Sequence, residues 1–151
     1  MDNWDKINAV QRMQDYIHEH ITEPITLHKL AEAARYSPWH SSRIFKELTG
    51  KTPFAYIREL RLSQAAVKLL DNNAKIIDVA LDFVFDSHEG FTRAFSKQFG
   101  VTPQYFSKNA PQFKLFMPIR IRDSYLKMQK GEDNMEKSNK PNTVFVQVIE
   151  R

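Results

Sequence analysis

The sequence has no cysteine among its 151 residues. Disulfide bonds, thiolate zinc sites and cysteine nucleophiles are therefore excluded for this chain. A complete lack of cysteine also fits a reducing compartment, so we expect the protein to be cytoplasmic.

Glycine is scarce as well, with four residues in the whole chain. No glycine-rich loop that could cradle a phosphate is present, and no serine lies in a nucleophile-elbow motif. His18 and His20 are two positions apart on an expected helix and therefore point in different directions, without a cysteine or acidic partner. We expect neither an enzyme nor a bound metal or cofactor.

Long apolar runs are missing too, so no stretch of the sequence is suited to crossing a bilayer. The acidic start, residues 1–5, does not resemble a signal peptide. We therefore expect no membrane partner. A hydrophobic content of 42% with eleven phenylalanines is nevertheless sufficient for a packed core.

Net positive charge is small over the region that we expect to be compact. Residues 1–110 carry 14 Lys and Arg against 13 Asp and Glu, and residues 111–151 carry 8 against 5. The overall net charge of +4 is therefore concentrated in the tail. An interaction with nucleic acid must depend on where the cations of residues 1–110 lie.

Residues 36–50 have two contrasting faces when they are placed on a helix. One face is suited to a core and holds Ser41, Ile44, Phe45 and Leu48. The other face holds an aromatic ring, a hydroxyl and two cations without a carboxylate, namely Trp39, Ser42, Arg43 and Lys46. Ser37 is an expected N-cap and Gly50 an expected C-terminal stop. This composition predicts a recognition helix for duplex DNA.

Apolar periodicity and capping residues predict six more helices around this one. The expected helices cover residues 4–20, 26–34, 37–50, 52–73, 75–83, 87–100 and 102–110. The pair 26–34 and 37–50 has the layout of a helix-turn-helix.

The same layout occurs twice in the chain. Ala31 and Tyr36 match Ala80 and Phe85 at an offset of 49. From the recognition helix onward the offset is 50, with the pairs Ser37 and Ser87, Arg43 and Arg93, Phe45 and Phe95, Gly50 and Gly100, and Thr52-Pro53 and Thr102-Pro103. Two such units in register are a strong signal of a duplicated helix-turn-helix.

These repeats resemble the DNA-binding domain of AraC/XylS-type transcription regulators, most closely the MarA, SoxS and Rob group. The similar segments are 36–40 with 43–45, Arg61-Leu62 with Ala65, Ala80 with 85–87, 91–95, and 99–103. The resemblance covers roughly residues 5–108. It implies an all-α fold with two helix-turn-helix subdomains joined by a long central helix, whose recognition helices enter successive major grooves.

The chain departs from the family pattern in three respects. Arg35 and Val84 stand where the family often has glycine before the aromatic of each turn. Because a β-branched residue is strained at positive φ, we expect the second turn to differ in geometry. Tyr105-Phe106 replaces the usual Tyr-Arg, and the second recognition helix carries Glu89 and Gly90 where amides or hydroxyls are common.

Candidate site residues follow from the two recognition helices. Arginine can chelate the O6 and N7 of guanine, and the other groove residues can contact base edges or a thymine methyl. The expected base contacts are Trp39, Ser42, Arg43, His88, Glu89, Thr92 and Arg93. The expected phosphate contacts are Lys46, Lys51 and Lys97, with backbone amides at the helix starts Thr52 and Thr102.

The tail has a different character, so we divide the chain into a DNA-binding domain over 1–110 and an extension over 111–151. Residues 113–122 suggest a short extended piece, residues 130–142 a polar linker, and residues 143–149 one β-strand. This single strand lacks a partner within the chain, and the stretch resembles the entry to a GyrI-like ligand-sensing domain. We expect a fragment of a longer regulator or pairing with another molecule.

The sequence thus predicts a bacterial, sequence-specific transcription regulator that binds double-stranded DNA as a monomer. RNA polymerase is a candidate second partner, and a small-molecule effector is expected only if a fuller C-terminal domain exists. Two alternatives remain open. One is a helical module whose Trp39/Arg43 face binds an acidic protein, and the other is an architectural DNA binder without sequence preference.

Overall fold

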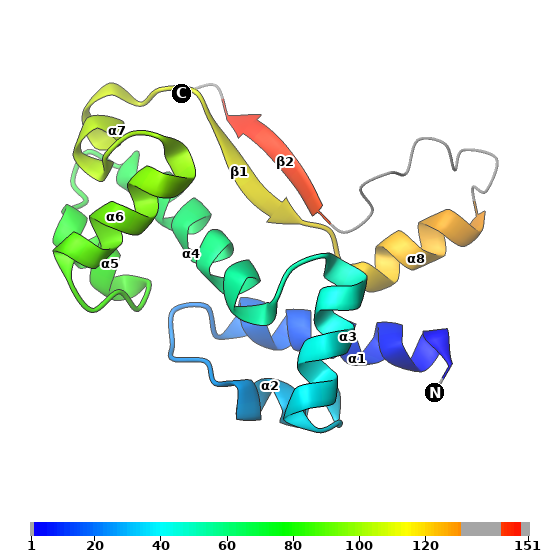
Figure 1. Ribbon diagram of the computed structural model, residues 1–151. Coiled ribbons are helices and arrows are strands. Elements are labelled where there is room, and N and C mark those ends of the chain that lie inside the picture. The colour runs from blue at the N-terminus through cyan, green and yellow to red at the C-terminus, as the bar shows by residue number, and fades with distance from the viewer. Residues whose placement is uncertain (1, 131–142, 149–151) are drawn as a thin grey trace. The chain divides into compact units, whose positions relative to one another are not determined.

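The computed structural model describes residues 2–130 and 143–148 and is mostly helical (Figure 1). Its elements are α1 (Asn3–Glu19), α2 (Leu27–Ala34), α3 (Pro38–Thr49), α4 (Pro53–Leu69), α5 (Ile76–Asp82), α6 (His88–Phe99), α7 (Pro103–Asn109), β1 (Phe113–Pro118), α8 (Ile121–Lys130) and β2 (Thr143–Val148). The all-α class and the seven expected helices are confirmed. The long helix α4 ends at Leu69, earlier than expected, and α8 is an additional helix that was not predicted. None of the helices in the described residues is both long and apolar enough to cross a membrane.

The chain forms two compact units. The first is built from the described parts of residues 1–20, 25–56 and 117–144, and the second from those of residues 21–24, 57–116 and 145–151. The first unit contains α1, α2, α3 and α8, and the second contains α5, α6, α7 and most of α4. Each unit therefore holds one complete helix-turn-helix, as the repeat predicts.

In the first unit, α1, α2 and α3 pack against one another and α8 packs on α1. The apolar stripe of α1 is fully buried at Val10, Met13 and Ile17. From α3, Ile44 and Phe45 are buried in the same unit. The face of α3 that the sequence assigned to the core is thus buried, which leaves its other face exposed to a partner.

In the second unit, α6 packs against α5 and α7. Phenylalanine rings dominate its core, together with small and aliphatic residues of α4 and α5. The buried members are Leu62, Ala65, Ala66, Leu69, Val79, Ala80, Phe83, Phe91, Phe95, Phe106 and Phe113. Five of the eleven phenylalanines of the chain are thus buried in this core.

Helix boundaries follow the expected capping chemistry in both repeats. The side chains of Ser37 and Ser87 accept hydrogen bonds from backbone N–H groups three residues later, and each precedes a recognition helix. Gly50 and Gly100 adopt left-handed conformations at the ends of α3 and α6, with φ of 81° and 79°. A left-handed residue at this position closes a helix, and glycine adopts it without a steric cost.

Both turns place a left-handed residue before the aromatic, and they differ, as expected, in one hydrogen bond: the N–H of Arg35 donates to Ala31, four residues back, whereas that of Val84 donates to Leu81, three residues back. Arg35 has a φ of 67° and Val84 a φ of 68°. In the residues that follow, the N–H of Tyr36 donates to the carbonyl of Ala31, and the N–H of Phe85 donates to the carbonyl of Ala80. Tertiary packing therefore holds Val84 in a conformation that a β-branched side chain disfavours.

We expect Val84→Gly to raise the free energy of unfolding by about 1 kcal/mol. The substitution removes a left-handed strain of about 1–2 kcal/mol and adds a backbone-entropy cost of about 0.5–1 kcal/mol. The midpoint temperature of thermal unfolding should rise by about 2–4 °C. Val84→Ala keeps the positive φ and is the matched control, expected to give no gain. A lower melting temperature for Val84→Gly would contradict the assignment of strain to this residue.

The extension contains two strands that pair with each other as a two-stranded sheet (Figure 1). The expected extended piece over 113–122 is β1 only as far as Pro118, because residues 121 and 122 begin α8. The expected strand is β2, which ends at Val148. Our expectation that the last strand lacks a partner within the chain was wrong, because β1 supplies one. Ile149 and the polar run over 131–142 lie outside the described residues.

Candidate nucleic-acid interface

The outer face of α3 carries the predicted groove residues of the first unit. Trp39 is 69% exposed, although tryptophan usually lies in a core. Arg43 and Lys46 are also exposed, and Ser42 is half-buried. These four side chains therefore form one accessible face, on the side of α3 opposite to Ile44 and Phe45.

Trp39 and Arg43 also contact each other, because they are four residues apart on the helix. The guanidinium carbon of Arg43 lies 5.3 Å from the centroid of the Trp39 ring. A cation over an aromatic face at this distance is stabilised and loses rotamer freedom. The contact therefore favours an orientation of the guanidinium over the indole, a pairing that was not predicted from the sequence.

A shallow hollow on this face is lined by Trp39, Ser42, Arg43, Lys46 and Glu47. This face was expected to carry no carboxylate, so the presence of Glu47 corrects that expectation. Its carboxylate lies 3.6 Å from the Nζ of Lys6 on α1. This partner offsets the negative charge of Glu47 beside the two cations.

The equivalent face of α6 presents a different set of groups. His88, Glu89, Arg93 and Lys97 are exposed. Thr92 is only half-buried as a residue, yet its hydroxyl oxygen is fully buried and has no hydrogen-bond partner within residues 2–130. The hydroxyl of Thr92 therefore cannot contact a base in this conformation.

The two threonines expected at phosphates are helix caps. The Oγ1 of Thr52 accepts the N–H of Ala55 at 3.2 Å, and the Oγ1 of Thr102 accepts the N–H of Tyr105 at 3.1 Å. Their hydroxyl oxygens accept these capping bonds, and the O–H of each threonine can still donate to an anion together with the backbone N–H groups at these helix starts. Lys51, just before Thr52, is half-buried.

Two other arginines are structural. Arg61, part of the quoted resemblance, donates to the carbonyls of Ile21 at 2.9 Å and Glu23 at 2.7 Å. Arg12 donates to the carbonyls of Ala33 and Ala34 at the end of α2. Burial lowers the pKa of both guanidinium groups. These two cations are therefore used within the protein, whereas Arg43, Lys46, Arg93 and Lys97 on α3 and α6 are exposed.

Comparison with known proteins agrees with this architecture. A family model described as a helix-turn-helix domain matches residues 30–109. The right origin-binding protein of Escherichia coli K12 is 39% identical over 120 residues, which cover 78% of this chain and 41% of that protein. The regulatory protein SoxS of Salmonella typhimurium LT2 is 36% identical over 94 residues, which cover 62% of this chain and 88% of SoxS.

A solved structure gives the same result. The crystal structure of a probable AraC family transcriptional regulator from Rhodopseudomonas palustris matches with a TM-score of 0.63 at 28% identity, covering 68% of this chain and 97% of that one. The chain spans 41% of the length of the right origin-binding protein and most of the length of SoxS. The duplicated helix-turn-helix, its capped recognition helices and these relatives lead to one conclusion. The chain belongs to the AraC-type helix-turn-helix family of DNA-binding transcription regulators.

Proposed function

We propose that this chain is a sequence-specific regulator that binds double-stranded DNA as a monomer and reads two adjacent major-groove segments with α3 and α6. The observation that carries the proposal is the equivalent placement of Arg43 and Arg93. Both are exposed, and each lies on the helix face opposite a buried phenylalanine, Phe45 or Phe95. A chain with two recognition helices does not need a second copy to contact two half-sites.

The proposed division of work separates bases from phosphates. Arg43 and Arg93 read guanine, Trp39 contacts sugar or a thymine methyl, and Ser42, His88, Glu89 and the hydrocarbon of Thr92 contact neighbouring base edges. Lys46, Lys51 and Lys97, with the backbone amides at Thr52 and Thr102, fix the register on the phosphates. Affinity then comes mainly from the phosphate contacts and specificity from the base contacts.

Residues 1–110 are the proposed DNA-binding domain, and residues 111–151 are the proposed link to an effector domain. RNA polymerase is the proposed second partner of the DNA-bound regulator. A small-molecule effector belongs to this proposal only for a protein with a fuller C-terminal domain.

A salt titration separates this function from binding to an acidic protein. Three lysine–phosphate contacts release counterions, so the logarithm of the association constant should fall with the logarithm of salt with a slope of about −3 or steeper. Lys97→Ala should make the slope shallower by about 1 without changing which sequences are preferred. Binding to duplex DNA that is insensitive to salt, or that shows no sequence preference in competition, would refute the proposal.

A further inference from the structure

Each recognition helix has an aromatic residue behind it at an equivalent position of the repeat. Tyr56 and Phe106 are 50 residues apart, and both are fully buried. Tyr56 meets Phe45 of α3 edge-on, with ring centroids 5.1 Å apart and an interplanar angle of 84°. Phe106 meets Phe95 of α6 in the same way, at 5.5 Å and 77°. These rings support the buried faces of the helices that carry Arg43 and Arg93.

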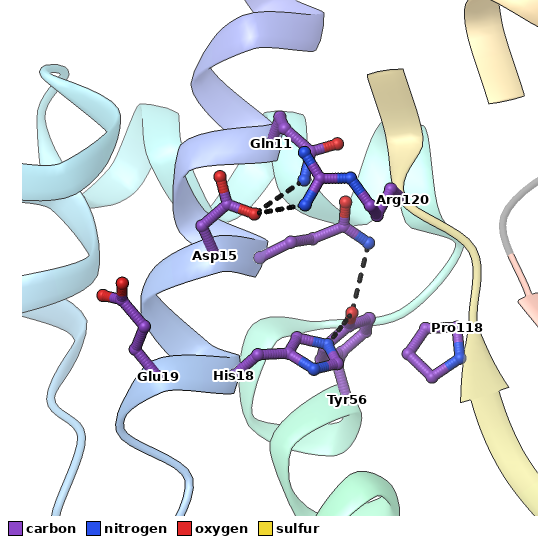
Figure 2. Close-up of a pocket in the computed structure, with 8 residues that line it drawn as sticks. Gln11, Asp15, His18, Glu19, Tyr56, Pro118 and Arg120 are labelled. Carbon is purple, nitrogen blue, oxygen red and sulfur yellow. Dashed lines mark hydrogen bonds and ion pairs between the residues drawn. The ribbon is translucent and has the colours of Figure 1, made fainter. Parts of the chain in front are cut away.

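In the first unit, this aromatic is held by hydrogen bonds from α1. The hydroxyl of Tyr56 accepts from the Nε2 of Gln14 at 3.1 Å and lies 3.1 Å from the Nε2 of His18 (Figure 2). Burial raises the pKa of Tyr56 and lowers the pKa of His18. The tyrosine therefore stays protonated beside a neutral imidazole, and its hydroxyl can donate to His18 while it accepts from Gln14.

Gln14 also binds the chain that connects β1 to α8. Its Nε2 donates to the carbonyl of Ile119 at 3.1 Å, and its Oε1 accepts the N–H of Ile121 at 2.8 Å. The Oε1 of Gln11 accepts the next N–H, that of Arg122, at 2.9 Å. Both N–H groups belong to the first turn of α8, which has no intrahelical partner for them. The two glutamines of α1 therefore act as a cap for α8.

An ion pair reinforces this junction at the surface. The carboxylate of Asp15 accepts from Gln11 at 2.9 Å and from Arg120 at 3.1 Å (Figure 2). Asp15 and Arg120 are each about half exposed, so this pair adds little by itself. The buried amide of Gln14, 2% exposed, is the central member of the network.

In the second unit, the equivalent aromatic is held by the start of the same segment. The ring of Phe113 lies 4.6 Å from Phe106 and 5.9 Å from Phe99, edge-on to both. Three residues later, the N–H of Phe116 donates to the buried Oγ of Ser63 on α4 at 2.8 Å. This end of the segment is therefore anchored by apolar packing and by one buried hydrogen bond.

We propose that residues 113–122, which lie outside both helix-turn-helix repeats, position both recognition helices from behind. The end at 119–122 acts on α3 through Gln14 and Tyr56, and Phe113 acts on α6 through Phe106. Gln14 and Phe113 are thus positioning residues for the proposed reading of DNA, on which this inference rests. A change in the extension could then alter the reading of one half-site without any change in a DNA-contacting side chain.

The test uses the full 151-residue chain with two substitutions and one matched control. Gln14→Leu removes the amide, Phe113→Ala removes the ring, and Met117→Ala alters an exposed side chain of the same segment. The half-site read by α3 is called the first box and the half-site read by α6 the second box. Binding is measured on duplexes in which one of the two boxes is scrambled. Gln14→Leu should weaken binding to the first box by about 5–10-fold and leave the second unchanged, as expected for the loss of a buried hydrogen-bond junction. Phe113→Ala should weaken binding to the second box and leave binding to the first box unchanged. Met117→Ala should change the binding to neither box.

Hydrogen exchange of the free proteins tests the same inference without DNA. Amides of α3 should exchange faster in Gln14→Leu, and those of α6 should exchange faster in Phe113→Ala. If the unsubstituted chain binds no DNA, the proposed function fails while these exchange patterns still decide the inference. Equal effects of each variant on α3 and α6, or no effect on either, would overturn it.

A milder variant covers the case in which Gln14→Leu does not fold. Tyr56→Phe keeps the ring against Phe45 and removes only the hydroxyl that Gln14 binds. It should give faster exchange in α3 and a smaller, first-box-specific loss of affinity. Unchanged α3 exchange in Tyr56→Phe would overturn the assignment of Gln14 as a positioning residue.

Discussion

Arg43→Ala is expected to weaken binding to the preferred duplex by about 5- to 150-fold, which corresponds to about 1–3 kcal/mol. The guanidinium is exposed on α3 and lies over the Trp39 ring, 5.3 Å from its centroid. Because a bidentate contact to guanine is lost, the penalty should fall on one position of the first box. Competition binding with single-base variants of the duplex measures both the loss and its position.

Lys46→Ala is the matched control for this prediction. Lys46 lies on the same exposed face one turn later, and we assign it to phosphate. Its removal should weaken all sequences by a similar factor and leave the preferred bases unchanged. If Arg43→Ala lowered affinity evenly for every sequence, Arg43 would contact the backbone and would not read a base.

Phe95→Ala is expected to lower the free energy of unfolding of the second unit by about 3–5 kcal/mol. The ring is fully buried and lies within 4.7–5.6 Å, centroid to centroid, of Phe91, Phe99 and Phe106. Its removal leaves a cavity that these large, rigid rings cannot fill. Urea unfolding followed by circular dichroism measures the change, and binding to the second box should be lost with it.

Tyr105→Ala is the control for the stability prediction. Tyr105 neighbours Phe106 on α7 but is 51% exposed, so its truncation should change the free energy of unfolding by about 0.5 kcal/mol or less. A comparable loss of stability in both variants would show that the aromatic cluster is not the centre of the second unit.

Local signals were sufficient to predict most of the helical framework. The ends of α3 and α6 are fixed by contacts within a few residues, which Ser37 and Gly50 make in the first repeat and Ser87 and Gly100 in the second. Because the motif is repeated, the helix boundaries expected in one unit could be compared with those expected in the other. The exposed position of Trp39 was also predictable, because Phe45 of the same helix already occupied the buried face.

Interactions between distant residues were not predictable in this way. Gln14 bonds to Ile119 and Ile121, more than 100 residues away, and nothing in the sequence distinguishes it from a solvated glutamine on α1. The backbone conformation of Val84 was likewise not predictable from its residue type. Its side chain disfavours positive φ, but the left-handed conformation shared with Arg35 prevails.

The most direct test of the central proposal is selection of duplexes from a random pool by this chain, in moderate salt and with excess competitor DNA. The proposal that α3 and α6 both read major-groove bases predicts enrichment of two boxes about one helical turn apart. Arg43→Ala should then lose one box and Arg93→Ala the other. Enrichment of a single box, or of no sequence at all, would contradict the proposal that one chain reads two half-sites.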